Sequence, residues 1–385
     1  MKVVMVETGG WGGLAHYAWN LCQALSQAGA QVLLLTHERY ELDHLPRTFA
    51  VQRQFRSDRS YLSMVRDLIG NVRMFGGTII HFQSLLSERK DLFLMWKLRR
   101  AGQTIVMTAH NTLPHEPRMG DALTWRWLYR GADLVICHTR WSSHELQRVH
   151  GLVESRIMVI PHGNYLFFGP PSLPDAEAAR VSLGLPVGDL VILAFGALRP
   201  YKGVEDLLAA FPEVLHAVPR ARLVVAGPAW SDQDDYERLI RVSGVADRIH
   251  FRPEYIPMDL VSHYFQAADV VAFPYRSIDQ SGSLQLAMGY GKPVVATAVG
   301  GFNEFLSTGE GGLVVPANDP ASLAKALIAL LSDPDARERM GRYNHERAKT
   351  ALSWNRIASL TIEAYRQVSR GSKANNKAVI NEGIS

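Results

Sequence analysis

Short apolar runs that end in glycine or polar residues alternate with helical patterns along almost the whole chain. Runs of this length, rich in Val, Ile and Leu, are typical of strands covered on both faces. Strands that alternate with helices form parallel sheets, because a parallel connection needs a crossover. The sequence therefore predicts an α/β protein with doubly wound parallel sheets. We expect strands at Lys2–Glu7, Gln31–Thr36, Thr78–His81, Thr104–Thr108, Leu134–His138 and Ile157–Pro161, and then at Val191–Phe195, Arg222–Ala226, Ile249–Phe251, Val270–Phe273, Pro293–Ala296 and Gly312–Val315.

Chain length and a Pro/Gly-rich stretch predict two domains. A chain of 385 residues is too long for one compact core and suits two domains of about 170–200 residues. The seam is expected after Pro161-His162-Gly163-Asn164 and before Gly169-Pro170-Pro171. We therefore expect an N-terminal Rossmann-like domain over 1–165, a C-terminal one over 166–352, a closing helix over 353–370 and a polar, disordered tail over 371–385.

The composition is that of a soluble globular chain, with 47% hydrophobic and 20% charged residues. No apolar run reaches the roughly 20 residues that span a bilayer, and the run after Met1 is too short for a signal peptide. Cys22 and Cys137 lie in apolar contexts and offer no disulfide framework, which suits a reducing compartment. We therefore expect a cytoplasmic protein.

Positive charge is concentrated in the first half. The whole chain has a net charge of +4, and residues 45–100 hold 11 Lys/Arg against 4 Asp/Glu. Two interpretations stay open: a solvated basic surface, or a surface that meets anionic lipid or a pyrophosphate-linked acceptor, which would place the protein peripherally at the inner face of a membrane. Nucleic acid is not expected as a partner, because no RNA- or DNA-binding motif accompanies the charge.

Two glycine turns in the second half combine strand ends with phosphate-binding chemistry. Residues 191–203 read as a buried strand followed by Gly196, Arg199 and Lys202. Residues 280–284, Gln-Ser-Gly-Ser-Leu, open a helix soon after the strand Val270–Phe273. Backbone N–H groups and fixed positive charge just past a strand's carboxyl end bind phosphate in α/β folds. The second half is therefore predicted to bind a phosphate-bearing ligand.

These motifs resemble the donor half of the retaining glycosyltransferases of the GT-B fold, the glycogen-synthase-like group of glycosyltransferase family 4 (group 1). The resemblance covers roughly residues 1–370 and implies two Rossmann-like domains facing a cleft. It implies transfer of a hexosyl unit from a UDP-sugar or GDP-sugar to a hydroxyl of a glycan or lipid-linked sugar acceptor, with retention. The implied setting is bacterial glycan, polysaccharide or glycolipid synthesis, and neither a metal nor an organic cofactor is implied.

The resemblance also implies roles for individual residues. Arg199 and Lys202 match the cations that stabilise the leaving diphosphate, and His110 matches a histidine that lies against the donor sugar. These three form the implied catalytic set. The implied donor-binding residues are Gly12, Gly13, Gly196, Arg252, Glu254, Gln280, Ser281, Gly282, Ser283, Leu284 and Glu304, and the implied acceptor-binding residues are Trp11, His16 and His115.

The glycine cluster Thr8–Gly13 read alone suggests a dinucleotide site. A lone glycine cluster is weak support for one, and no acidic residue ends the second strand at Thr36 to bind a ribose 2′-hydroxyl. The resemblance instead implies that this loop faces the donor phosphate and the acceptor, with Trp11 placed to stack on a sugar ring.

One segment departs from the family pattern. The usual Glu-x7-Glu pair would fall on Ile278 and Leu286, so both carboxylates are missing. Asp279 or Gln280 could replace the first, and Gln285 could contact the ribose. Two alternatives to a transferase therefore stay open: a non-catalytic sugar-nucleotide-binding subunit and a GT-B sugar-nucleotide epimerase. The acid-poor segment 276–286 argues against the epimerase.

Overall fold

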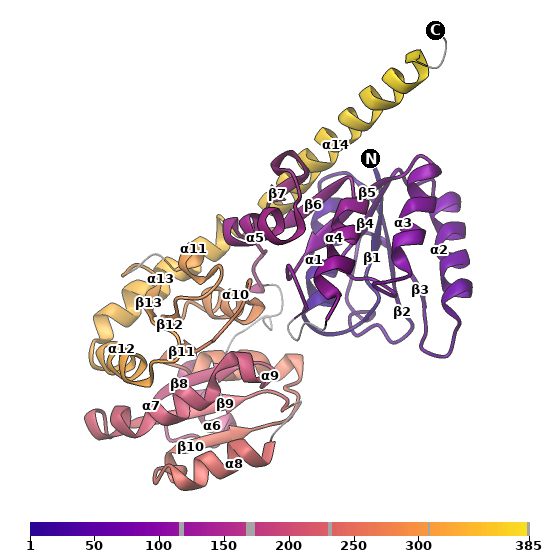
Figure 1. The fold of residues 1–385 in the computed structure, drawn as a ribbon. Coiled ribbons are helices and arrows are strands. Elements are labelled where there is room, and N and C mark those ends of the chain that lie inside the picture. The colour runs from indigo at the N-terminus through magenta and orange to yellow at the C-terminus, as the bar shows by residue number, and fades with distance from the viewer. Residues whose placement is uncertain (115–118, 167–173, 230–232, 307–308, 383–385) are drawn as a thin grey trace. The chain divides into compact units, whose positions relative to one another are not determined.

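The structure is a computed structural model that describes residues 1–114, 119–166, 174–229, 233–306 and 309–382, with side chains up to residue 369. The chain forms two units, residues 1–163 with 353–385 and residues 164–352. The seam predicted after residue 165 lies close to the end of the first unit at Gly163, and the chain returns to that unit at Ser353, where the closing helix was expected to start. Figure 1 shows this helix, α14 (Trp354–Glu382), in yellow. It continues past residue 370, where we expected a disordered tail, and its sequence holds no proline that would end it.

The first unit contains a seven-stranded parallel sheet in the order β3-β2-β1-β4-β5-β6-β7, flanked by helices (Figure 1). Its elements before α14 are β1 (Lys2–Val6), α1 (Gly12–Gln27), β2 (Gln31–His37), β3 (Ala50–Phe55), α2 (Tyr61–Phe75), β4 (Ile79–Phe82), α3 (Asp91–Arg100), β5 (Thr104–Ala109), α4 (Asp121–Gly131), β6 (Leu134–Cys137), α5 (Arg140–His150), η1 (Glu154–Arg156) and β7 (Ile157–Val159).

The second unit contains a six-stranded parallel sheet in the order β10-β9-β8-β11-β12-β13. Its elements are α6 (Ala176–Ser182), β8 (Leu190–Phe195), η3 (Pro200–Lys202), α7 (Val204–Ala217), β9 (Ala221–Ala226), α8 (Gln233–Val242), η4 (Ala246–Arg248), β10 (Ile249–Arg252), α9 (Met258–Ala267), β11 (Val270–Phe273), α10 (Gly282–Gly289), β12 (Val294–Thr297), α11 (Phe302–Phe305), β13 (Gly312–Val315), α12 (Pro320–Ser332) and α13 (Pro334–Lys349).

Alternation along the buried strands explains why each sheet is covered on both faces. In β8, Val191 and Leu193 pack with Phe265 of α9, whereas Ile192 and Ala194 pack with Phe211 of α7. Because both sets of side chains are apolar, neither face of the strand can meet water. The prediction of doubly wound parallel sheets is confirmed.

Strand β3 was missed because it lies at the edge of its sheet. Its sequence, Ala-Val-Gln-Arg-Gln-Phe, has three consecutive polar residues and so gives no apolar run, and Gln52 and Arg53 are exposed. It pairs only with β2, so only part of its surface needs to be apolar. Within the described residues, no helix combines the length and hydropathy needed to cross a membrane.

The strand order of each sheet reverses direction once, and this reversal fixes where a ligand can bind. In the second sheet the reversal lies between β8 and β11, and in the first between β1 and β4. In open α/β sheets, the loops that leave the carboxyl ends of the two strands at such a reversal diverge and expose a crevice. The loops after β8 and β11 and those after β1 and β4 are therefore the places to examine for a site.

Substitution of Gly300 should destabilise the second unit. Gly300 has a φ of +51°, and an added Cβ would lie only 1.5 Å from the carbonyl oxygen of Ile278. We expect Gly300→Ala to lower the urea midpoint of unfolding by an amount equivalent to about 2 kcal/mol or more. Gly188→Ala is the matched control, because an added Cβ there meets no atom within 4 Å. Equal midpoints for the two variants would contradict this account of the turn.

Candidate functional site

The turn after β8 contains two glycines with positive φ angles. Gly196 has a φ of +110° and Gly203 a φ of +61°. An added Cβ at Gly203 would lie 2.1 Å from the carbonyl oxygen of Pro274, so only glycine allows this contact. Pro274 follows β11, and the turns after β8 and β11 therefore touch backbone to backbone at the reversal point of the sheet.

This contact brings a cation and a hydroxyl together. An added Cβ at Gly196 would lie 2.9 Å from Lys202 Nζ and 3.0 Å from Ser283 Oγ. Ser283 lies in the first turn of α10, whose N-cap Ser281 accepts a hydrogen bond from the Leu284 amide. The N–H groups that start a helix have no partner inside the helix, and the helix dipole favours negative charge there. Lys202, Ser283 and the start of α10 thus form a compact corner whose charge and hydrogen-bond donors suit an anion, and we call it the anion-binding corner.

The Lys202 side chain lies against the ring of Tyr275, in the turn that follows β11. Its Nζ lies 5.3 Å from the centroid of the Tyr275 ring. Burial lowers the pKa of Lys202, and burial raises the pKa of Tyr275 to about 12. A desolvated ammonium interacts more strongly with an anionic ligand than a hydrated one, because the effective dielectric constant is lower.

Arg276 stabilises the turn that carries Lys202, a role that no local sequence pattern predicts. Its amide donates to the Tyr201 carbonyl at 2.7 Å, and its guanidinium donates to the Pro200 carbonyl at 3.3 Å. The same guanidinium binds Asp206 at 2.8 Å and 3.1 Å, and this pairing raises the pKa of Arg276. Arg276 therefore links the start of α7 to η3 and holds the turn in place.

The two missing glutamates are replaced by side chains that pack in the core. Ile278 is buried, and Leu286 is half-buried against the same cluster. The neighbouring Gln285 is fully buried, and neither atom of its amide has a hydrogen-bond partner among the described residues. A buried amide without partners is costly, so Gln285 is the polar group at this helix that most needs a ligand or a water.

The remaining donor-site residues predicted from the sequence fall into two groups. Gln280 and Gly282 flank the start of α10, and Arg199 is the N-cap of η3, so these lie with the anion-binding corner. Leu284 contributes only through the backbone, because its side chain is in the core. Arg252, Glu254 and Glu304 are all exposed. Arg252 ends β10, which is separated from β8 by β9, and Glu304 lies in α11 after β12.

In the first unit, the glycine loop after β1 is filled by carboxylates of the same unit. Glu7 is buried and accepts hydrogen bonds from the Gly9 and Gly10 amides at 2.8 Å and 2.9 Å, and from Thr36 at 2.9 Å. Burial raises the pKa of Glu7, and these hydrogen bonds oppose the shift. The amides that a dinucleotide phosphate would need are therefore already bonded, which argues against a dinucleotide site here.

A second carboxylate occupies the start of α1. Glu41 accepts from the Gly12 amide at 2.9 Å and lies 3.1 Å from His16 Nε2. His16 is thus paired rather than open to an acceptor, and the predicted phosphate role of Gly12 would require displacement of Glu41. Trp11 is 54% exposed at the tip of this loop, and Gly13 follows Gly12 in the first turn of α1. The predicted acceptor residue His115 lies outside the described residues.

Four histidines meet at the carboxyl edge of the first sheet. They lie in or shortly after four adjacent strands, β4 to β7, and all are buried: His81, His110, His138 and His162. Tyr17 of α1 packs among the last three, with ring centroids 4.8 to 5.2 Å apart. The sequence predicted a site role for His110 but did not predict that these histidines contact one another, because the contacts join residues far apart in the chain.

Both ring nitrogens of His110 are engaged. Its Nε2 lies 2.8 Å from Gln83 Oε1, and its Nδ1 lies 3.3 Å from His138 Nε2. The Gln83 amide also contacts His81 at 3.1 Å. A sugar hydroxyl could bond the His110 ring only by displacing one of these partners.

His110 nevertheless lines an open cavity. The cavity has a volume of about 280 Å³ and is bordered by the ends of β4 and β5, by Leu14 of α1 and by Trp125 of α4. Its size is near the lower limit of small-molecule pockets. Leu14 is 40% exposed, whereas Ala18 and Leu21 further along α1 are buried.

All four histidines are neutral at pH 7. Burial lowers the pKa of His81 and of His162 to about 3, and that of His138 to about 4. Burial and the neighbouring histidines also lower the pKa of His110 well below its usual range. Protonation of a buried histidine costs solvation free energy, and a neighbouring imidazolium would repel the new charge, so the neutral form is favoured.

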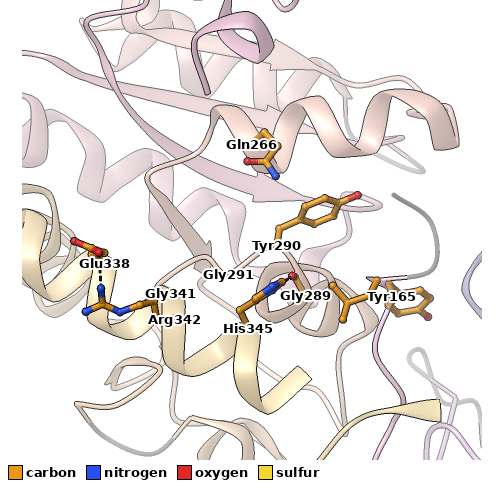
Figure 2. Close-up of a pocket in the computed structure, with 10 residues that line it drawn as sticks. Tyr165, Gln266, Gly289, Tyr290, Gly291, Glu338, Gly341, Arg342 and His345 are labelled. Atoms are coloured by element: carbon orange, nitrogen blue, oxygen red, sulfur yellow. Dashed lines mark hydrogen bonds and ion pairs between the residues drawn. The ribbon is translucent and has the colours of Figure 1, made fainter. Parts of the chain in front are cut away.

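A larger cavity lies in the second unit (Figure 2). It has a volume of about 440 Å³ and includes Tyr165, Tyr290 and His345, whose Nδ1 donates to the Gly289 carbonyl at 2.7 Å. Gly289 ends α10, whereas the anion-binding corner lies at the start of that helix. The cavity and the corner are thus at opposite ends of α10.

The two doubly wound units, with an anion-binding corner at the reversal point of the second sheet, define the GT-B class. A family model described as Glycosyl transferases group 1 matches residues 189–333, and one described as Glycosyltransferase Family 4 matches residues 11–164. The chain is 30% identical over 305 residues to a D-inositol 3-phosphate glycosyltransferase of Corynebacterium urealyticum, covering 75% of this chain and 71% of that protein. The chain therefore belongs to the group 1 glycosyltransferases of family 4.

One further sequence relative and one solved structure show how much of the chain is similar to known proteins. The D-inositol 3-phosphate glycosyltransferase of Kineococcus radiotolerans is 34% identical over 265 residues, or 64% of this chain but only 60% of that protein, so this match spans less than two thirds of the relative. The structure of Anabaena HepE in complex with UDP-glucose has a TM-score of 0.80 at 18% identity, over 95% of this chain and 100% of that one. The second similarity establishes the fold.

The histidine cluster should make the protein sensitive to acid. Between its folded pKa of about 4 and its unfolded value near 6.5, His138 binds fewer protons in the folded state, so stability present above pH 6.5 is lost as the pH falls toward 4. The loss from His138 alone is on the order of 3 kcal/mol. We expect the unfolding midpoint to fall over this window, and to fall less in His138→Asn. The control His216→Asn, at an exposed position of α7, should behave like the unsubstituted protein. An identical pH dependence in both variants would contradict the assignment.

Proposed function

We propose that the protein is a retaining glycosyltransferase that moves a hexosyl unit from a nucleoside diphosphate sugar to an acceptor hydroxyl. The observation that carries the proposal is the convergence of Lys202 Nζ and Ser283 Oγ at Gly196, beside the start of α10. When a glycosidic bond to a diphosphate breaks, negative charge grows on the β-phosphate. A desolvated cation and helix N–H groups are placed to stabilise that charge.

The donor is proposed to be a UDP-sugar or a GDP-sugar. HepE, which has the same fold, was solved with UDP-glucose, and this favours UDP as the first donor to test. Stabilisation of the diphosphate by side chains and N–H groups is consistent with a reaction without a metal. Within the described residues, no group of three or more His, Cys, Asp or Glu side chains is arranged to hold a metal ion.

The first unit is proposed to hold the acceptor, a glycan or a lipid-linked sugar, with His110 close to the transferred sugar. The cavity beside His110 supports this part of the proposal. The neutral histidines favour a role in hydrogen bonding and shape, because their lowered pKa values leave no imidazolium at neutral pH. Bacterial glycan or glycolipid synthesis is the setting we propose.

A non-catalytic sugar-nucleotide-binding subunit is the second candidate. It is favoured by Ile278 and Leu286, which pack in the core at the positions where the family pattern has glutamates. Release of UDP or GDP from a donor without acceptor separates the two: slow hydrolysis supports the enzyme, and binding without any release supports the subunit.

Loss of either cation should impair turnover much more than folding. We expect Arg199→Ala or Lys202→Ala to lower kcat by about 100-fold or more, since one such donor contributes roughly 3 kcal/mol to the barrier. Donor hydrolysis and acceptor transfer are measured beside the unfolding midpoint. Lys325→Ala, at an exposed position of α12, is the matched control and should retain full activity. Near-normal transfer by both cation variants would remove the donor-site assignment.

Nucleotide affinity should depend little on the ribose 2′-hydroxyl. The side chain of Leu286 cannot accept the hydrogen bond that a glutamate would, so we expect UDP and 2′-deoxy-UDP to bind within ~1 kcal/mol of each other by calorimetry. A large loss on deoxygenation would show that another residue contacts the ribose. If that residue is the buried Gln285, then Gln285→Leu should remove the difference.

A further inference from the structure

Helix α3 carries two aromatic side chains that point away from the core of the first unit. Leu94, Met95 and Leu98 form its buried face. Phe93 is 58% exposed and Trp96 is 50% exposed on the opposite side. Large aromatic side chains that remain in water sacrifice the burial free energy that they could gain, so their placement on a surface needs an explanation.

These two rings form an ordered surface with two cations. The Phe93 and Trp96 rings are stacked, with centroids 5.6 Å apart and an interplanar angle of 19°. Lys97 Nζ lies 4.8 Å from the Phe93 centroid, and Arg100 Cζ lies 4.8 Å from the Trp96 centroid. The spacing i, i+3, i+4, i+7 puts all four on one side of the helix. We call Phe93, Trp96, Lys97 and Arg100 the α3 aromatic–basic face.

The neighbouring helices extend this chemistry. Helix α4 packs beside α3, and the strand order β3-β2-β1-β4-β5-β6 with right-handed crossovers places α2, α3 and α4 on the same side of the sheet. Helix α4 exposes Leu123 and Trp127, and α2 exposes Leu62. Five of the basic residues of 45–100 belong to these helices: Arg66 and Arg73 in α2, and Lys97, Arg99 and Arg100 in α3.

The acidic residue of α3 does not interrupt the positive charge of this layer. Asp91 is buried, accepts a hydrogen bond from Tyr61 at 2.8 Å, and also accepts from the Leu86 and Ser87 amides. Its carboxylate is therefore turned inward. The outer side of α3 presents aromatic rings and cations without a competing anion on that helix.

We propose that the α3 aromatic–basic face docks on the headgroup region of an anionic lipid bilayer. Aromatic rings favour the boundary between headgroups and acyl chains, and Lys and Arg are attracted to anionic headgroups beside it. The stacked rings supply the apolar contact and the two cations supply charge complementarity. This docking goes beyond the proposed transfer reaction and does not depend on it, since it can occur whether or not the protein turns over a donor.

The test is flotation of the full-length protein with vesicles of phosphatidylcholine alone or mixed with phosphatidylglycerol. We expect binding only to the mixed vesicles and release as salt is raised. Lys97→Glu with Arg100→Glu should lower partitioning by roughly tenfold or more, since each cation near an anionic surface contributes about 1 kcal/mol. Phe93→Ala with Trp96→Ala should lower it as well, and circular dichroism should show that both variants remain folded.

A charge-matched control separates this face from general electrostatics. Arg238→Glu with Arg241→Glu makes the same change in net charge on α8 of the second unit, where both side chains are well exposed. This control should bind like the unsubstituted protein. The proposal is overturned if the protein fails to float with anionic vesicles at low salt, if the control loses binding equally, or if the aromatic substitutions disperse a self-associated form and leave vesicle binding unchanged.

Discussion

The second unit depends on the close approach of backbones at the carboxyl edge of its sheet. An added Cβ at Gly203 would lie 2.1 Å from the Pro274 carbonyl oxygen, and an added Cβ at Gly300 would lie 1.5 Å from the Ile278 carbonyl oxygen. These contacts are possible only for glycines, and they join the turns that leave β8, β11 and β12. Because the turns are joined, Lys202 and Ser283 are presented to one point although they are far apart in sequence. The anion-binding corner is thus a consequence of the sheet's reversal point and of a few missing side chains.

The corresponding edge of the first sheet carries different chemical groups. There the glycine loop is bonded to Glu7 and the start of α1 to Glu41, so the backbone donors are satisfied by the protein's own carboxylates. The next strand ends carry neutral histidines in contact with one another. One sheet edge therefore presents a cation and the start of a helix, and the other presents neutral hydrogen-bonding groups. This difference is consistent with the proposed division between a donor unit and an acceptor unit.

The sequence predicted the buried strands and the glycine turns well, because both leave a local pattern. Apolar runs predicted the central strands, which the structure confirms, and the residues around Gly196 and Gly282 predicted a phosphate site, whose turns the structure brings together at one point. What could not be predicted depends on contacts between distant residues. Arg276 reaches Asp206, and Gln83 joins His81 to His110. The edge strand β3 was missed for another reason, since it carries too few apolar residues to be recognised.

The most direct measurement is calorimetric titration of the protein with UDP, UMP and uridine, repeated with Lys202→Met. If the corner at Lys202, Ser283 and the start of α10 holds the diphosphate, affinity should rise steeply from uridine to UMP to UDP, and Lys202→Met should remove most of the gain from the β-phosphate. Equal affinities for uridine and UDP, or a gain that survives in Lys202→Met, would contradict the account. GDP, GMP and guanosine in parallel would show that the result does not depend on the choice of base.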